Sequence, residues 1–146
     1  MIMKGTLTSI VLTATLAAPL ALAEVDIDKV DDALKTAEQY GFSHYTEIEF
    51  EEGGKVEVEG WIDDSTDAEV DFAADGTVSS EDKEAREGGP KGVSADTIRY
   101  AVETARTKGV TSIESISSEQ AGEVEIEGKA GDGKAVELNV VTAQRD

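Results

Sequence analysis

The sequence predicts an α+β protein made of two tandem repeats, each with one helix followed by a three-stranded antiparallel sheet. Three observations predict this fold class. The two halves of the chain align without a gap at a shift of 68 residues, from Val25 to Val93. Each half opens with apolar residues at helical spacing, and each continues with apolar residues at every second position. The 146 residues are enough for one domain or two very small ones.

The first 23 residues are typical of a secretory signal peptide. They contain one base, Lys4, and no acid, then an apolar run over residues 7–22, and they end in the small-x-small pattern Ala21-Leu22-Ala23. A membrane anchor is the alternative, but threonines, a serine and a proline interrupt the run, and a span needs about 20 continuous apolar residues. We therefore expect a periplasmic or secreted protein that begins at Glu24 and is not inserted in a membrane.

The chain after residue 23 contains an internal duplication. Chance does not keep one register through glycines and apolar positions alike, so one supersecondary unit is used twice. We place the first repeat at residues 24–78 and the second at residues 93–146. Residues identical at the shift of 68 include Asp28/Asp96, Ala33/Ala101, Thr36/Thr104, Gly41/Gly109, Ile48/Ile116, Gly54/Gly122, Val56/Val124, Glu57/Glu125, Glu59/Glu127, Gly60/Gly128 and Glu69/Glu137.

Each repeat begins with a predicted helix that ends at a glycine. In the first repeat, Asp26 and Asp28 lie at the positive N-terminal end of the helix dipole, and Gly41 ends the helix. In the second, Ser94 is the expected N-cap and Gly109 ends the helix. The apolar stripes consist of Ile27, Val30, Ala33, Leu34 and Ala37, and of Ala95, Ile98, Ala101, Val102 and Ala105.

Three strands with alternating polarity follow each helix, which predicts sheets with one face on a helix and one in solvent. In the first repeat a Gly53-Gly54 turn separates the first two strands, and an Asp75-Gly76 turn follows the third. The inward residues there are His44, Thr46, Ile48, Phe50, Val56, Val58, Ile62, Ala68, Val70 and Phe72, and those of the second repeat are Val124, Ile126, Val136, Leu138 and Val140. The outward residues include Tyr45, Glu47, Glu49, Glu57, Glu59, Trp61, Asp67, Glu69 and Asp71.

Residues 79–92 lie between the repeats. This segment is rich in charged residues and glycine and lacks apolar periodicity, so we predict an acidic, glycine-containing mobile linker. Because each repeat has only about 50 residues, close to the limit for folding alone, the two repeats are expected to pack together.

These short motifs resemble the PepSY domain family, over nearly the whole mature chain. The residues that carry the resemblance are Ala33, Ala37, Gly41, Ile48, Glu49, Gly53, Gly54, Val56, Glu57, Val58, Val70, Asp71, Asp75 and Gly76, with Gly109, Ile116, Gly122, Val124, Glu125 and Ile126 in the second repeat. The second repeat has Ala143-Gln144 in place of the final Asp-Gly. The resemblance implies an inhibitory or protein-binding role, and the tandem pair is similar in architecture to the β-lactamase inhibitor protein.

Composition excludes several functions. The chain has no cysteine, so disulfides and thiolate metal sites are excluded. Loss of Lys4 lowers the basic count from 13 to 12 against 32 acids, so the mature chain carries a formal charge of −20. Such a charge repels phosphate backbones, so nucleic acid is not an expected partner. No nucleophile elbow, phosphate loop or metalloprotease motif is present, and we expect neither catalysis nor a cofactor.

Four residues form the predicted protein-binding site. The strand register places Trp61 beside Glu57 and Glu59 on the outward face, with Tyr45 on the neighbouring strand. An exposed tryptophan is a common anchor of protein interfaces. The alternative is a β-bulge at Gly60 that turns Trp61 inward. The outward glutamates are expected to be well solvated, so nothing separates them into acid and base roles.

Two groups of residues could in principle bind a metal ion, and each has a simpler interpretation. His44 is the only histidine, and without cysteine a zinc site would need carboxylates for its remaining ligands, so a local hydrogen bond is the expected role. Residues 63–67 offer oxygen ligands for calcium, with an echo at Asp132, but they lack the central glycine and distal glutamate of a calcium loop. Asp and Ser are also ordinary turn residues, and we expect no metal site.

The sequence therefore favours an exported, non-catalytic protein-binding module, such as an inhibitor or regulator of a peptidase or another cell-envelope enzyme. The alternative is an acidic solubility or cation-buffering protein of the cell envelope without a single specific partner.

Overall fold

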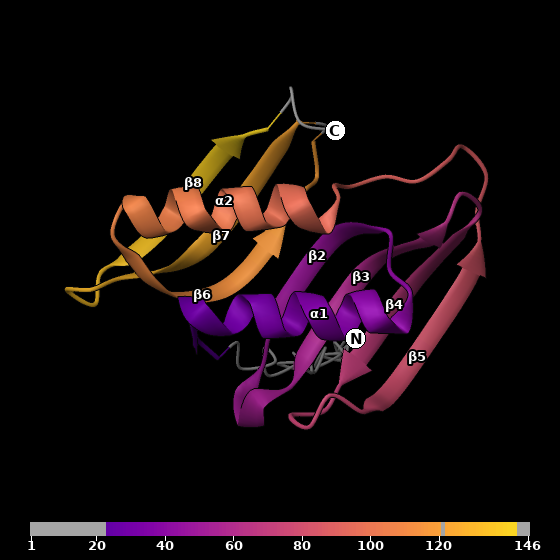
Figure 1. Cartoon of the computed structure of the whole chain (residues 1–146), viewed down its shortest axis with the longest axis horizontal. Helices are drawn as coiled ribbons and strands as arrows, with labels where there is room; N and C mark the ends of the chain where they lie inside the picture. The colour runs from indigo at the N-terminus through magenta and orange to yellow at the C-terminus, as the bar shows by residue number, and fades with distance from the viewer. Residues whose placement is uncertain (1–22, 121, 143–146) are drawn as a thin grey trace, which may run out of the picture.

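The computed structural model describes residues 23–120 and 122–142 (Figure 1). The predicted signal peptide, residues 1–23, lies outside the described residues except for Ala23, whose backbone N–H donates to the carbonyl of Phe50 at 2.9 Å. No helix within the described ranges is long and apolar enough to cross a membrane.

One antiparallel sheet of eight strands forms the body of the molecule. Its strand order is β5-β4-β3-β2-β6-β7-β8, and β1 pairs with β6 beside this path. The strands are β1 (Val25–Asp26), β2 (His44–Phe50), β3 (Val56–Asp63), β4 (Thr66–Phe72), β5 (Val78–Ala85), β6 (Val110–Ser117), β7 (Glu123–Ala130) and β8 (Ala135–Val141).

The predicted fold class, two tandem helix-plus-three-strand repeats of an α+β protein, is wrong: the fold is mainly β. The strands that directly follow the two helices, β2 and β6, pair with each other, with Ile48 opposite Ile116. The sheet therefore continues from one half of the chain into the other. Alternating polarity shows which face of a strand is buried, but it does not show which strands are hydrogen-bonded neighbours in the sheet.

The predicted linker, residues 79–92, is also different in the structure. Its first part is strand β5, which pairs with β4 along its length, from Val78 opposite Phe72 to Ala85 opposite Thr66. Every residue of β5 is exposed. Because neither side of this edge strand is covered, its sequence shows no alternation, and the strand could not be predicted from apolar periodicity.

Two helices lie side by side on one face of the sheet, α1 (Val30–Tyr40) over the first half and α2 (Ala95–Thr107) over the second (Figure 1). Short 3₁₀ turns occur at Ile27–Lys29 and Glu52–Gly54. Ser94 caps α2, since its hydroxyl accepts from the backbone N–H of Thr97 at 3.2 Å.

The hydrophobic core fills the space between the helices and the sheet. Each large apolar side chain that is fully buried there contributes about 1.5–3 kcal/mol to stability. The largest of these are Leu34 of α1, Ile98 of α2, and Tyr45, Ile48, Phe50, Ile113, Ile116 and Ile126 of the strands.

A β-bulge occurs at the same place in both halves of the sheet. The register shifts between Tyr45 and Glu47 where β2 pairs with β3, and between Ile113 and Ser115 where β6 pairs with β7. Each bulge lies opposite a glycine, because a Cβ on Gly60 or Gly128 would come within 2.0 Å of a backbone carbonyl oxygen. The bulges decide which way the neighbouring side chains point.

Candidate functional site

The face of the sheet opposite the helices is lined with carboxylates, and we call it the carboxylate face. It arises because apolar residues at alternate positions of each strand pack under the helices, which leaves the acidic residues between them on the other side. Its members are Glu47 and Glu49 of β2, Glu57 and Glu59 of β3, Glu69 and Asp71 of β4, Glu125 and Glu127 of β7, and Glu137 of β8.

The register places like charges directly opposite each other. Across β4, β3 and β2, one row joins Glu69, Glu59 and Glu47, and the next joins Asp71, Glu57 and Glu49. Beyond β2 both rows pass serines of β6. The first row then meets Glu125 of β7 and Asn139 of β8, and the second meets Glu127 and Glu137. Opposed like charges destabilise a strand pair, so this arrangement opposes folding.

The carboxylates of β2 and β3 have perturbed acidities. Burial raises the pKa of Glu47 to about 7, and the adjacent Glu49 and Glu59 add to the rise. Burial likewise raises the pKa of Glu57 to about 7, with Asp71 and Glu69 contributing next. The pKa of Glu59 is also raised, chiefly by burial. The expectation that these outward glutamates are well solvated is therefore wrong, because the packed sheet face shields part of each side chain from water.

One carboxylate oxygen on this face is without a donor. Asp71 Oδ1 is enclosed and has no hydrogen-bond partner among the described residues. The described residues also hold no group of three or more histidine, cysteine or acidic side chains placed to bind a metal ion. The face therefore presents many acceptors over a wide area and gathers no described set of them into a coordination site.

Trp61 lies on the carboxylate face, as its register predicts, but the predicted exposure is wrong: only 4% of it is accessible. Its strand neighbours are His44 on β2 and Asp67 on β4. Trp61 does not belong to the main core cluster of the described residues. It is buried separately, on the opposite side of the sheet.

The chain between β5 and α2 crosses the sheet near Trp61, and we call residues 86–92 the crossing segment. Its first residue, Arg86, is held beside β4. The Arg86 guanidinium lies 2.6 Å from Asp67, and its backbone N–H donates to the carbonyl of Ser65. It ends at β2, where Val93 exchanges two backbone hydrogen bonds with Tyr45. Because β3 lies between β4 and β2, the segment passes the end of β3, and its residues line one hollow together with Trp61.

Tyr45 is not on the outward face, so its predicted place in the binding site is wrong. The bulge after it turns the side chain into the core, where it is 1% exposed and its ring centroid lies 5.8 Å from that of Phe42. Its hydroxyl has no hydrogen-bond partner among the described residues, and burial raises its pKa. The alternative for Trp61, a β-bulge at Gly60 that turns it inward, is wrong: the bulge lies in β2 opposite Gly60, and the residue that turns inward is Tyr45.

The other residues considered as metal ligands have local partners. His44 Nδ1 lies 3.0 Å from the hydroxyl of Ser43. In the 63–67 segment, Asp63 accepts hydrogen bonds from the backbone N–H and the hydroxyl of Ser65 at 2.9 and 3.2 Å. These bonds hold the pKa of Asp63 below its usual value and form the turn between β3 and β4.

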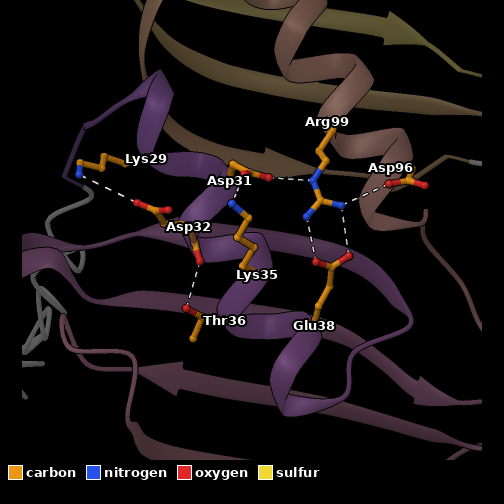
Figure 2. Close-up of polar contacts among 8 residues, drawn as sticks. All are labelled: Lys29, Asp31, Asp32, Lys35, Thr36, Glu38, Asp96 and Arg99. Carbon is orange, nitrogen blue, oxygen red and sulfur yellow. Dashed lines mark hydrogen bonds and ion pairs between the residues drawn. The ribbon is translucent and has the colours of Figure 1, made fainter.

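A second charged cluster joins the two helices on the opposite side of the molecule, and sequence reasoning missed it. The Arg99 guanidinium of α2 donates to both oxygens of Glu38 at 3.2 and 2.8 Å, to Asp31 at 2.8 Å and to Asp96 at 3.2 Å (Figure 2). Lys35 lies 2.8 Å from the same Asp31. These cations hold the pKa values of Asp31 and Glu38 below the usual range. The cluster fastens α1 to α2 through ion pairs between their side chains.

Comparison with protein-family models finds no match for this chain, and comparisons with curated proteins and with solved structures find none either. The resemblance to the PepSY family stays a prediction.

Proposed function

We propose that this protein is a non-catalytic module that binds a basic surface of a partner protein through the carboxylate face. The observation that carries the proposal is the register of the carboxylates, which sets Glu47 against Glu59 and Glu49 against Glu57 without a cation between them. A fold that keeps opposed like charges at a cost in stability is one in which a second molecule relieves the repulsion.

The extent of the face favours a protein surface over a single ion. The carboxylates reach from β4 to β8, five strand spacings, which is about 24 Å at about 4.8 Å between neighbouring strands. Half-buried carboxylates have already lost part of their hydration, so a lysine or arginine brought against them gains more than it would from a fully solvated carboxylate.

The remaining parts of the proposal come from the sequence. The predicted signal peptide supports a periplasmic or secreted protein, and the resemblance to PepSY domains supports a peptidase or another cell-envelope enzyme as the class of partner. Trp61 and Tyr45 are not contact residues in this proposal, because both are buried. Glu57 and Glu59 remain contact residues.

Binding of a decalysine peptide to two variants of equal charge tests the proposal. Glu49→Gln/Glu59→Gln removes two charges from the face, and Asp64→Asn/Asp132→Asn removes two from hairpin turns outside it. We expect the face variant to lose at least about tenfold in affinity, equivalent to about 1.4 kcal/mol, and the turn variant to stay within about twofold of the wild type.

The same variants separate the proposal from cation buffering. Equal losses in both variants mean that binding follows net charge alone, which is the behaviour of an acidic protein without a specific partner and contradicts the proposal. The wild type and both variants can also serve as baits in a cell-envelope extract. The partner is the protein that the wild type and the turn variant retain and that the face variant does not.

A further inference from the structure

Glu47 and Glu57 occupy interior positions of the carboxylate face. Glu47 of β2 lies between Glu59 of β3 and Ser117 of β6. Glu57 of β3 lies between Glu49 of β2 and Asp71 of β4. Each therefore has at least one carboxylate directly opposite, and each also has another acid two residues away on its own strand.

The charged groups that raise the pKa values of this pair are all acidic. They are Glu49 on β2, Glu59 on β3, Glu69 and Asp71 on β4, and Glu119 in the loop after β6, whereas β6 itself contributes Ser115 and Ser117. Two nearby cations pair with acids outside this set: Arg86 with Asp67 and Glu84, and Lys129 with Glu24. Lys91 lines the hollow beside Glu59 and Glu69.

Ionising either carboxylate in this setting has two costs. The side chain is half-buried, so its charged form loses hydration, and each new negative charge is repelled by those already present. Both effects favour a bound proton, and they move the pKa values of Glu47 and Glu57 to about 7, within the range of physiological pH.

We propose that Glu47 and Glu57 form a proton-controlled gate for docking, in which the face binds a basic partner when both are ionised and releases it when both are protonated. This inference rests on the proposed function. A partner's lysine or arginine stabilises the ionised form, so binding expels protons, and by linkage an excess of protons expels the partner. Affinity falls as the pH is lowered through 7, while the partner's lysines keep their charge.

The experiment measures decalysine binding at about pH 8 and about pH 5.5 at one ionic strength, since these values bracket the titration of both glutamates. We expect the dissociation constant of the wild type to rise at least about tenfold at the lower pH. Glu47→Gln/Glu57→Gln is expected to bind at both pH values as the wild type does at the lower one. Asp64→Asn/Asp132→Asn keeps the full pH dependence and controls for charge.

NMR titration of the side-chain carboxyl carbons is a second readout that needs no partner, with midpoints near 7 expected for both glutamates. Midpoints below about 5 overturn the gate. No binding at either pH overturns the docking proposal itself, whatever the midpoints are. Equal binding at both pH values leaves docking intact and overturns the gate. A pH dependence that survives Glu47→Gln/Glu57→Gln belongs to other carboxylates and overturns the assignment to this pair.

Discussion

At the scale of single residues, the two aromatic side chains beside the bulge are both buried, Tyr45 inside the main core cluster and Trp61 outside it. Tyr45 fills core volume but carries a hydroxyl that has no hydrogen-bond partner among the described residues. Trp61 is buried outside the main core cluster and lines a hollow together with residues of the crossing segment. The sequence predicts that both contact a partner, but in the structure both side chains are buried.

Tyr45→Phe is expected to raise the free energy of unfolding by about 1 kcal/mol, because it removes a buried, unsatisfied hydroxyl and keeps the ring. Urea denaturation measures the change. A loss of stability greater than about 1 kcal/mol means that the hydroxyl is satisfied and contradicts this account of the core.

Trp61→Ala is expected to lower the free energy of unfolding by about 3 kcal/mol, since truncation of a buried tryptophan leaves a cavity. Because Trp61 is the only tryptophan, its fluorescence also reports the site directly, and we expect emission at shorter wavelength than that of indole in water. Water-like emission together with a loss of less than about 1 kcal/mol restores the interpretation of Trp61 as an exposed anchor.

At the scale of elements, the bulges in β2 and β6 determine which side chains enter the core. The bulged strand brings a carbonyl oxygen over the backbone of its neighbour, so that neighbour has no room for a side chain. The oxygens belong to His44 and Ser112, and the glycines beneath them are Gly60 and Gly128. The two sites are 68 residues apart, as are the aligned halves of the sequence.

Gly60→Ala and Gly128→Ala are each expected to lower the free energy of unfolding by about 3 kcal/mol, because the new Cβ meets a carbonyl oxygen at 2.0 Å. Gly131→Ala is the matched control. A Cβ there has its nearest neighbour at 3.6 Å, so a change within about 0.5 kcal/mol is expected. Equal effects of all three substitutions in thermal or urea unfolding contradict the role given to the bulges.

The elements also show what could be predicted from sequence. The apolar stripes that end at Gly41 and Gly109 lie where α1 and α2 are found, because burial against a core imposes helical spacing on a sequence. The pairing of β2 with β6 could not be predicted, because it is made by backbone groups that every residue has. Strand β5 has no apolar pattern because it buries neither face. Strict alternation puts Tyr45 on the outer face, and a single bulge residue in β2 reverses that direction.

At the scale of the whole molecule, the carboxylate face and the helix cluster divide the charge of the protein unequally. Arg99 and Lys35 form ion pairs on the helix side of the molecule, with Asp31 and Glu38. The face on the other side keeps its acids opposed to one another. The carboxylate face therefore has a charge that changes with pH near neutrality.

This asymmetry gives the stability an unusual dependence on pH. Glu47 and Glu57 have pKa values near 7 in the folded protein, above the usual value of 4.5, so the folded state binds more protons than the unfolded state between these values. Stability is thus present at the lower pH and is lost as the pH rises through 7. Below about pH 4 the trend reverses, because Asp31 and Glu38 have lowered pKa values and their ion pairs are lost on protonation.

We expect the free energy of unfolding to be roughly 2 kcal/mol greater near pH 5 than near pH 8, a figure reduced for solvent screening because both glutamates are only half-buried. Thermal unfolding followed by circular dichroism measures the difference. In Glu47→Gln/Glu57→Gln the difference is expected to shrink to less than half. A wild type that is more stable at pH 8 than at pH 5 contradicts the raised pKa values.

The most direct test of the central claim, that the carboxylate face is the docking surface, is an NMR titration of the isotope-labelled protein with decalysine at about pH 8, where both glutamates are ionised. The account predicts backbone shift changes concentrated on β2, β3 and β4, around Glu47, Glu49, Glu57 and Glu59. Changes that follow the exposed acids evenly over the turns, β5 and the helices contradict it, and they identify the protein as a diffuse polyanion without a docking face.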